Sequence, residues 1–146
     1  MKFLDSLKPL SLLVLRTALA LIFIFHGYPK LIHPSEGMRE FFLQHGMPAY
    51  FVSASGILEC FGGLLLLVGL FTRPAALLLA GEMAVAIWKV HSVRGALAVN
   101  EYEFPLAVAA ACFVLATTGA GAASFDSLML GDSGSKRSRS SKKSKD

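Results

Sequence analysis

Four long apolar runs, each close to the length of a membrane-crossing helix, constrain this chain more than any other feature. A bilayer core of about 30 Å needs roughly 20 helical residues. The runs cover Leu10–Tyr28, Tyr50–Phe71, Pro74–Val90 and Phe104–Ala123. They are rich in Leu and Ala and lack the alternation of strands, and a helix satisfies its own backbone hydrogen bonds in lipid. We therefore predict an all-α fold, an integral membrane bundle of four transmembrane helices.

Composition separates this membrane domain from a tail. Hydrophobic residues make up 54% of the chain and charged residues only 16%, which is unusual for a soluble domain. The end of the chain, "GDSGSKRSRSSKKSKD", has no large apolar side chain, so it cannot bury enough surface to offset its ordering entropy. We expect a membrane domain over residues 1–130 and a disordered basic tail over 131–146. The tail would be attracted to anionic lipid headgroups, and no nucleic-acid role is expected because no aromatic residues are interleaved with its basic ones.

The connections agree with a helical bundle. Between the first two runs, Glu36–Gln44 is a short amphipathic segment that we expect to lie along the membrane surface. Only "TRP" separates the second run from the third, where Thr72 can cap the next helix and Pro74 suits its first turn. This spacing predicts a tight helical hairpin.

The distribution of Lys and Arg predicts the orientation. An even number of spans puts both termini on one side, where Lys2, Lys8, Arg73 and six tail residues make nine basic residues. The opposite side has four: Lys30, Arg39, Lys89 and Arg94. The positive-inside rule therefore places both termini in the cytoplasm. Arg16 interrupts the apolar core of the first run, which argues against a cleaved signal peptide.

Five ionisable residues fall in the apolar runs or near their ends, and we group them as an intramembrane polar site: Arg16, His26, Lys30, Glu59 and Glu82. An unpaired charge in the bilayer core costs about 2.5–3.5 kcal/mol. On the first run, the three basic residues share roughly 80° of helical arc. We expect the five to converge in the bundle interior. Such a group could serve a function, or a pairing of Arg16 with Glu82 or Glu59 could only fix the helix register.

Other residues in the runs have simpler interpretations. Gly56 and Gly63 form a small-residue stripe around Glu59, which predicts close contact between helices. Cys60 and Cys112 are expected to pack as small apolar residues, with a redox pair as the alternative. The histidines outside the spans lack the spacing of metal ligands, so no metal site is expected.

Three segments resemble the DoxX family of small bacterial inner-membrane proteins with four helices. They are "LRTALALIFIFHGYPKL", "GILECFGGLLLLVGLFTRPAALLLAGEMAVAI" and "TTGAGAASFDSLM". The resemblance extends from about Leu12 to Leu130 and implies a multi-pass protein of the bacterial inner membrane. Its relatives include a subunit of a thiosulfate:quinone oxidoreductase, which implies a redox role. The matched positions are Arg16, His26, Gly27, Lys30, Glu59, Arg73 and Asp126. The sequence departs from the family pattern in "GAGAASFD", where relatives often carry a basic or aromatic residue before the Ser.

Two classes of function remain open. The first is a membrane subunit or accessory of a quinone- or thiol-linked oxidoreductase system. In it the polar site would receive a quinone headgroup, His26 or Glu59 would handle protons, and Arg16 or Lys30 would stabilise anionic charge. The chain has no haem, flavin or dinucleotide motif, so this class needs a separate redox partner. The second is a non-enzymatic small transporter, or a membrane scaffold that recruits partner proteins or copies of itself. Whether the chain is an enzyme is left undecided by the sequence.

Overall fold

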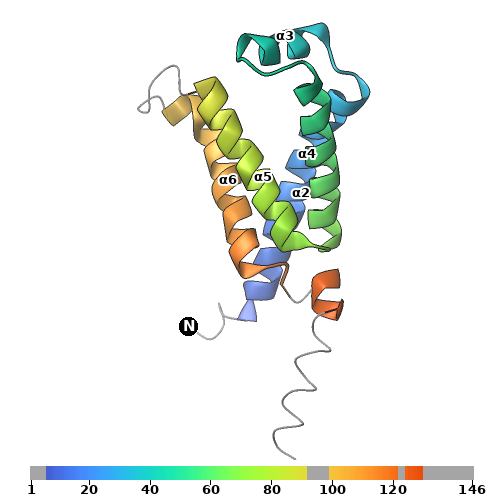
Figure 1. Cartoon of the computed structure of the whole chain (residues 1–146). Coiled ribbons are helices and arrows are strands. Elements are labelled where there is room, and N and C mark those ends of the chain that lie inside the picture. The colour runs from blue at the N-terminus through green and yellow to red at the C-terminus, as the bar shows by residue number, and fades with distance from the viewer. Residues whose placement is uncertain (1–5, 92–98, 122–123, 130–146) are drawn as a thin grey trace, which may run out of the picture.

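The computed structural model describes residues 6–91, 99–121 and 124–129, and these residues form a helical bundle (Figure 1). The helices of the bundle are α2 (Lys8–Ile32), α4 (Tyr50–Val68), α5 (Thr72–Ala86) and α6 (Val99–Thr118). A short helix, α3 (Glu36–Gln44), lies across one end, and a π-helical turn, η1 (Ile87–His91), continues α5. Within the described ranges all regular secondary structure is helical. The predicted all-α class is therefore confirmed for the described part.

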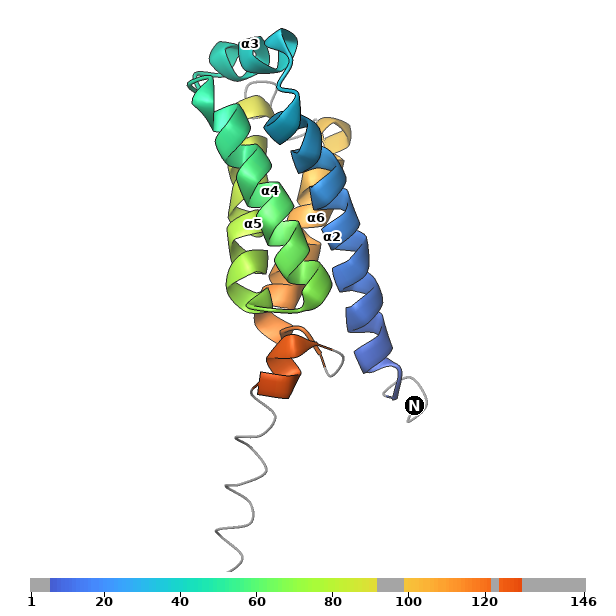
Figure 2. The same ribbon diagram turned by 90° about the vertical axis from the view of Figure 1, so that its right-hand side faces the viewer.

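The bundle consists of two helix pairs. Helix α2 packs mainly against α4, and α5 mainly against α6, while a tight turn joins α4 to α5. Figures 1 and 2 show the start of α2 and the helical turn at 125–129 at the same end of the bundle, opposite to α3. The predicted hairpin between the second and third runs is thus present.

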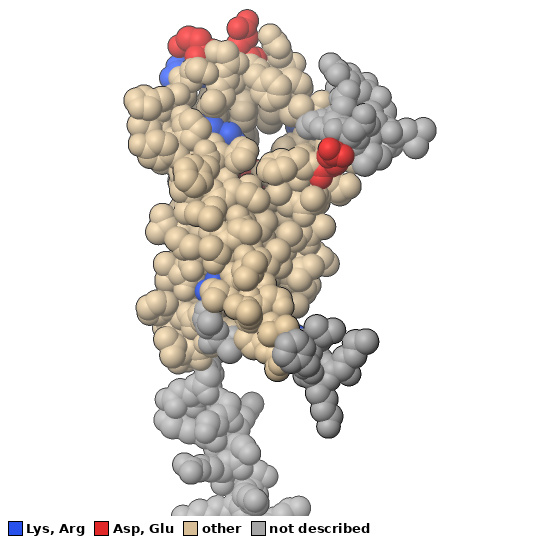
Figure 3. Space-filling view, turned by 180° about the vertical axis from the view of Figure 1, so that it is seen from behind, with Lys and Arg blue, Asp and Glu red and all other residues tan. Residues whose placement is uncertain are grey.

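The bundle is apolar both inside and outside. Its centre is formed by fully buried side chains such as Phe23, Leu66 and Leu79. Large apolar side chains also face outward, and Phe25 and Phe61 are 74% and 66% exposed. On the face drawn in Figure 3, charged side chains lie toward the two ends and the middle carries almost none. An apolar belt between charged ends is the surface expected of a protein surrounded by lipid.

Two of the described helices, α2 and α4, are long and apolar enough to cross a membrane. The apolar described part of α6, Tyr102–Thr118, is shorter, and α5 has 15 residues before η1. Helix α3 has the bounds expected from the sequence, because Ser35 caps it by accepting a hydrogen bond from the Met38 backbone N–H at 3.3 Å.

The ends of two apolar runs were predicted too late. Helix α4 ends at Val68 rather than near Phe71, since Gly69 adopts a left-handed conformation with φ of 76°. Helix α6 ends at Thr118 rather than at Ala123, because Gly119 has φ of 84° and leaves the helix. The predicted basic tail at 131–146 lies outside the described residues.

Candidate functional site

Three helices contribute to a polar cluster in the half of the bundle nearer to α3. The Lys30 ammonium of α2 lies 2.8 Å from Oε1 and 2.7 Å from Oε2 of Glu59 on α4. It also donates a hydrogen bond to the Ser55 hydroxyl at 3.2 Å. Ser55 in turn donates to Oε1 of Glu82 on α5, at 2.5 Å. We call Lys30, Ser55, Glu59 and Glu82 the lysine–glutamate cluster.

Local sequence explains how these side chains meet. Ser55 and Glu59 are four residues apart, so they lie on one face of α4. Lys30 is in the last turn of α2, where a cation interacts favourably with the helix dipole. Glycines then let α2 and α4 approach closely. A Cβ added to Gly27 would lie 2.7 Å from the Glu59 Cβ, and one added to Gly56 would lie 3.0 Å from the Lys30 Cβ.

The same helix contact continues toward the other end of the bundle. A Cβ added to Gly63 would lie 3.1 Å from the Ala20 carbonyl oxygen and 3.0 Å from the Ile24 side chain. The two glycines that the sequence singled out, Gly56 and Gly63, therefore both lie where α4 is closest to α2. The absence of a side chain at these positions is what the contact requires.

The cluster is buried, and its formal charges do not balance. The Glu59 side chain is 3% exposed and that of Lys30 is 21% exposed. Oxygen Oε2 of Glu82 is buried and has no hydrogen-bond partner among the described residues. One ammonium facing two carboxyl groups leaves room for one more proton, and the Glu82 oxygen can accept a hydrogen bond. The cluster can therefore hold a proton and can bind a group that donates one.

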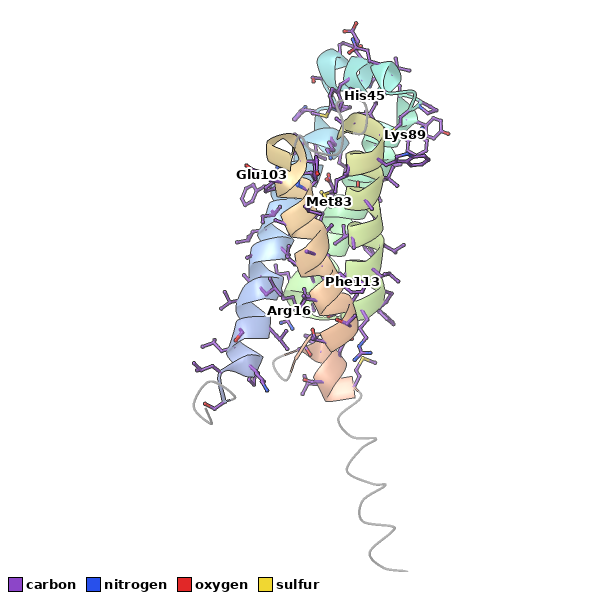
Figure 4. The ribbon with its side chains drawn as sticks, turned by 90° about the vertical axis from the view of Figure 1, so that its left-hand side faces the viewer. Arg16, His45, Met83, Lys89, Glu103 and Phe113 are labelled. Carbon is purple, nitrogen blue, oxygen red and sulfur yellow. The ribbon has the colours of Figure 1, made fainter. Side chains whose placement is uncertain are left out.

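Arg16 does not belong to this cluster. It is buried, and its Nη1 donates a hydrogen bond to the Ala120 carbonyl at 2.9 Å. It precedes Lys30 by 14 residues, which is about 21 Å along a helix. Figure 4 shows Arg16 in the half of the bundle away from α3, and Met83, the neighbour of Glu82 in sequence, in the half nearer to α3. The expectation that Arg16 meets Glu59 or Glu82 is therefore wrong.

His26 also lies apart from the cluster, although it belongs to the same helix as Lys30. The side chain is exposed, and its Nδ1 lies 2.8 Å from the Ile22 carbonyl oxygen one turn earlier. Its ring stacks on Phe104 of α6, with 5.6 Å between the ring centroids. The expectation that His26 joins the other ionisable residues is wrong, because its ring packs on α6 instead.

Two polar residues with clear roles were missed or misassigned from the sequence. Ser55 was missed, although its position one turn before Glu59 was a usable signal. Thr72 was expected to cap α5, but its hydroxyl is buried and has no partner among the described residues. The cap is instead Asp126, whose two carboxylate oxygens accept hydrogen bonds from the Phe71 and Thr72 N–H groups at 2.9 Å each. No local sequence pattern predicts that contact, because the bonded residues are more than 50 positions apart in the chain.

The two cysteines have different surroundings, and both are free. Cys112 is fully buried in the core of the bundle, as expected for a small apolar side chain. Cys60 is partly buried on α4, and its sulfur lies 3.9 Å from the Ile24 carbonyl oxygen of α2.

Comparison with known proteins gives one family. The DoxX family profile matches residues 11–92, more than half of the chain. The inner membrane protein YqjF of Escherichia coli is 32% identical over 126 residues, which is 85% of this chain and 95% of YqjF. An uncharacterized protein of Haemophilus influenzae is 37% identical over 91 residues, covering 62% of this chain and 66% of that protein, slightly less than two thirds.

The name of a more distant relative refers to redox chemistry. CatD of Bacillus subtilis, provisionally named an oxidoreductase, is 31% identical over 94 residues, or 64% of this chain and 69% of CatD. No solved structure matches the chain significantly.

Proposed function

Because the chain belongs to the DoxX family of membrane proteins, we propose that it is a membrane subunit or accessory of a quinone- or thiol-linked oxidoreductase system. The lysine–glutamate cluster would be the site where a redox ligand exchanges protons. The observation that carries this proposal is the buried Glu82 oxygen without a partner, joined through Ser55 to the Lys30–Glu59 pair. The provisional name of CatD points in the same direction.

The proposal includes a topology. Helices α2, α4 and α6, together with α5 and its continuation η1, would make four spans, with both termini in the cytoplasm and α3 on the outer surface. The excess of basic residues on the terminal side supports this orientation. The shared position of the two described chain ends supports an even number of crossings. The cluster then lies in the outer half of the membrane.

The geometry suggests how the cluster would act on a quinone. Reduction of a quinone to a hydroquinone consumes two electrons and two protons. The electrons would come from a partner protein of the thiol or thiosulfate class, because this chain has no cofactor motif of its own. The Lys30 ammonium can stabilise negative charge on a ring oxygen. Glu82 can pass on one proton and, after it is protonated again from the aqueous surface, the second. Ser55 accepts a hydrogen bond from Lys30 and donates one to Glu82, so its hydroxyl can relay a proton between them.

Access to the cluster is compatible with this role. The Lys30 side chain is partly exposed. On the face drawn in Figure 3 the surface is hollowed toward the end of the bundle that carries α3.

The test is a binding titration with purified protein in detergent. A short-chain ubiquinone or menaquinone analogue would be added while the fluorescence of Trp88, the single tryptophan of the chain, is followed. We expect Glu82→Gln and Glu59→Gln to weaken binding by about five-fold or more, as for the loss of a hydrogen bond to a charged group. The control is Glu40→Gln, the same change of charge at an exposed position of α3.

Equal affinity of the wild type and both cluster variants would contradict the proposal. Co-purification gives an independent reading. A stable redox partner from the native membrane supports the proposal. Solute flux through liposomes that contain only this protein would instead favour the transporter alternative.

A further inference from the structure

A second polar region lies at the opposite end of the bundle, around the turn between α4 and α5. A pocket of about 320 Å³ opens there. It lies between the first turn of α5, the segment after α6, and the helical turn at 125–129. The lysine–glutamate cluster takes no part in it, so the function proposed above leaves this pocket unexplained.

Two arginines make the pocket region positive. Arg73 lines it, and its Nε lies 3.1 Å from the position that a Cβ on Gly119 would occupy. Arg16 reaches the same segment from α2, where it bonds to the Ala120 carbonyl. The acidic residue of the pocket is Asp126, and both of its carboxylate oxygens already accept backbone N–H groups of the α4–α5 turn. The one arginine among the lining residues, Arg73, therefore lies in a pocket whose one carboxylate is occupied by capping.

A buried hydroxyl points to a ligand with acceptor oxygens. Thr72 lines the pocket and is 0% exposed, yet its Oγ1 has no hydrogen-bond partner among the described residues. Buried polar groups in folded proteins are nearly always satisfied. A hydroxyl donor beside a guanidinium fits a phosphate group, which offers several acceptor oxygens to both.

Apolar side chains beside the pocket distinguish a lipid from a free anion. Phe71 lines the pocket and is 62% exposed. Phe125, Leu128 and Met129 belong to the helical turn that supplies Asp126 and Ser127 to the pocket, and they are 53%, 73% and 68% exposed. The pocket lies where α4 and α6 end, which is the depth of the lipid headgroups in the topology proposed above. A phospholipid could place its phosphate in the pocket and its acyl chains against these side chains.

We propose that the pocket formed by Thr72, Arg73 and the segment around Gly119 binds the phosphate group of an anionic phospholipid on the terminal side of the membrane. The guanidinium of Arg73 would pair with the phosphate, and the Thr72 hydroxyl would donate to one of its oxygens. The inference depends on the membrane location of the bundle and not on its redox role.

The test is native mass spectrometry of the full-length protein in detergent, titrated with phosphatidylglycerol and, separately, with phosphatidylcholine. We expect phosphatidylglycerol to bind about five-fold more tightly than phosphatidylcholine. Arg73→Gln should remove that preference, and Arg73→Lys should keep part of it because it retains the charge. The matched control is Arg39→Gln on α3, an exposed arginine at the other end, which should leave it unchanged.

Thr72→Val is the second variant, since it keeps the shape of the side chain and removes only the hydroxyl. It should weaken phosphatidylglycerol binding by about two- to three-fold, and it decides the matter if Arg73→Gln fails to fold. Equal binding of the two lipids by the wild type would overturn the proposal. So would wild-type affinity for phosphatidylglycerol in Arg73→Gln or, if that variant does not fold, in Thr72→Val. Displacement of phosphatidylglycerol by inorganic phosphate at comparable concentration would also overturn it, because the ligand would then be a free anion.

Discussion

At the scale of single residues, the buried carboxylate of Glu59 is stabilised in the apolar bundle by an ion pair with Lys30. Glu59 is almost fully buried, and its carboxylate lies against the Lys30 ammonium from the neighbouring helix. Lys30 is partly exposed at the end of α2, so its charge remains close to a polar surface. Glu82 has one oxygen bonded to Ser55 and one without a partner, which makes it the least satisfied member of the cluster.

Removing the ammonium tests this pairing. Lys30→Met would leave Glu59 buried without a counter-charge, and we expect it to lower the free energy of unfolding by about 2.5–3.5 kcal/mol. Lys30→Met combined with Glu59→Met should recover most of that loss, because no unpaired charge remains. Thermal unfolding in detergent measures both variants. Arg39→Met, at an exposed position of α3, is the control and should unfold like the wild type. A double variant no more stable than Lys30→Met would contradict the pairing.

At the scale of elements, the contact between α2 and α4 depends on glycine. Gly27 on α2 and Gly56 and Gly63 on α4 bring the backbones so close that an added Cβ would lie within 2.7–3.0 Å of atoms in the facing helix. This close approach also places Lys30 and Glu59 within contact distance. Helix packing and the polar cluster therefore depend on the same residues.

A methyl group at the centre of this contact should separate the helices. Gly27→Ala would place its Cβ 2.9 Å from the Cys60 backbone nitrogen, which cannot rotate away. We expect a loss of about 1–3 kcal/mol in unfolding free energy, typical of overpacking. Gly81→Ala is the matched control, since an added Cβ there has no neighbour within 4 Å. It should leave stability unchanged or raise it by up to about 1 kcal/mol through helix propensity. Equal effects of the two substitutions would argue against the close contact.

At the scale of the whole molecule, the sequence predicts the bundle better than it predicts the site. Apolar runs of membrane length located the four long helices, because hydrophobicity over many residues determines where helices lie in lipid. The boundaries depended on single backbone conformations, such as the positive φ of Gly69 and Gly119, and were less accurate. Gly119, within the segment Thr117 to Gly121, ends α6. The sequence analysis overlooked it because the apolar run continues beyond it.

The site was predicted in part for a geometric reason. Lys30 and Glu59 do meet, and Ser55 links them to Glu82, because Lys30 and Glu82 lie near the C-terminal ends of α2 and α5, at the level of the middle of α4. Arg16 shares their helical face but not their depth, and a comparison of angles alone does not detect that difference. His26 does not join the cluster, because its ring stacks on Phe104. That contact could not be predicted without knowing the position of α6. The role of the cluster in function stays a prediction.

The central claim is that the bundle crosses the membrane with its two polar regions at opposite faces, and cysteine labelling in whole cells tests it most directly. In a chain with Cys60→Ala and Cys112→Ala, a single cysteine would be placed either on α3 by Gly37→Cys or before α2 by Ser6→Cys. Gly37 tolerates a side chain, because nothing lies within 4 Å of an added Cβ. With a membrane-impermeant maleimide, we predict that the α3 position reacts in intact cells and that position 6 reacts only after the inner membrane is permeabilised. Labelling of both positions from the same side would contradict the account.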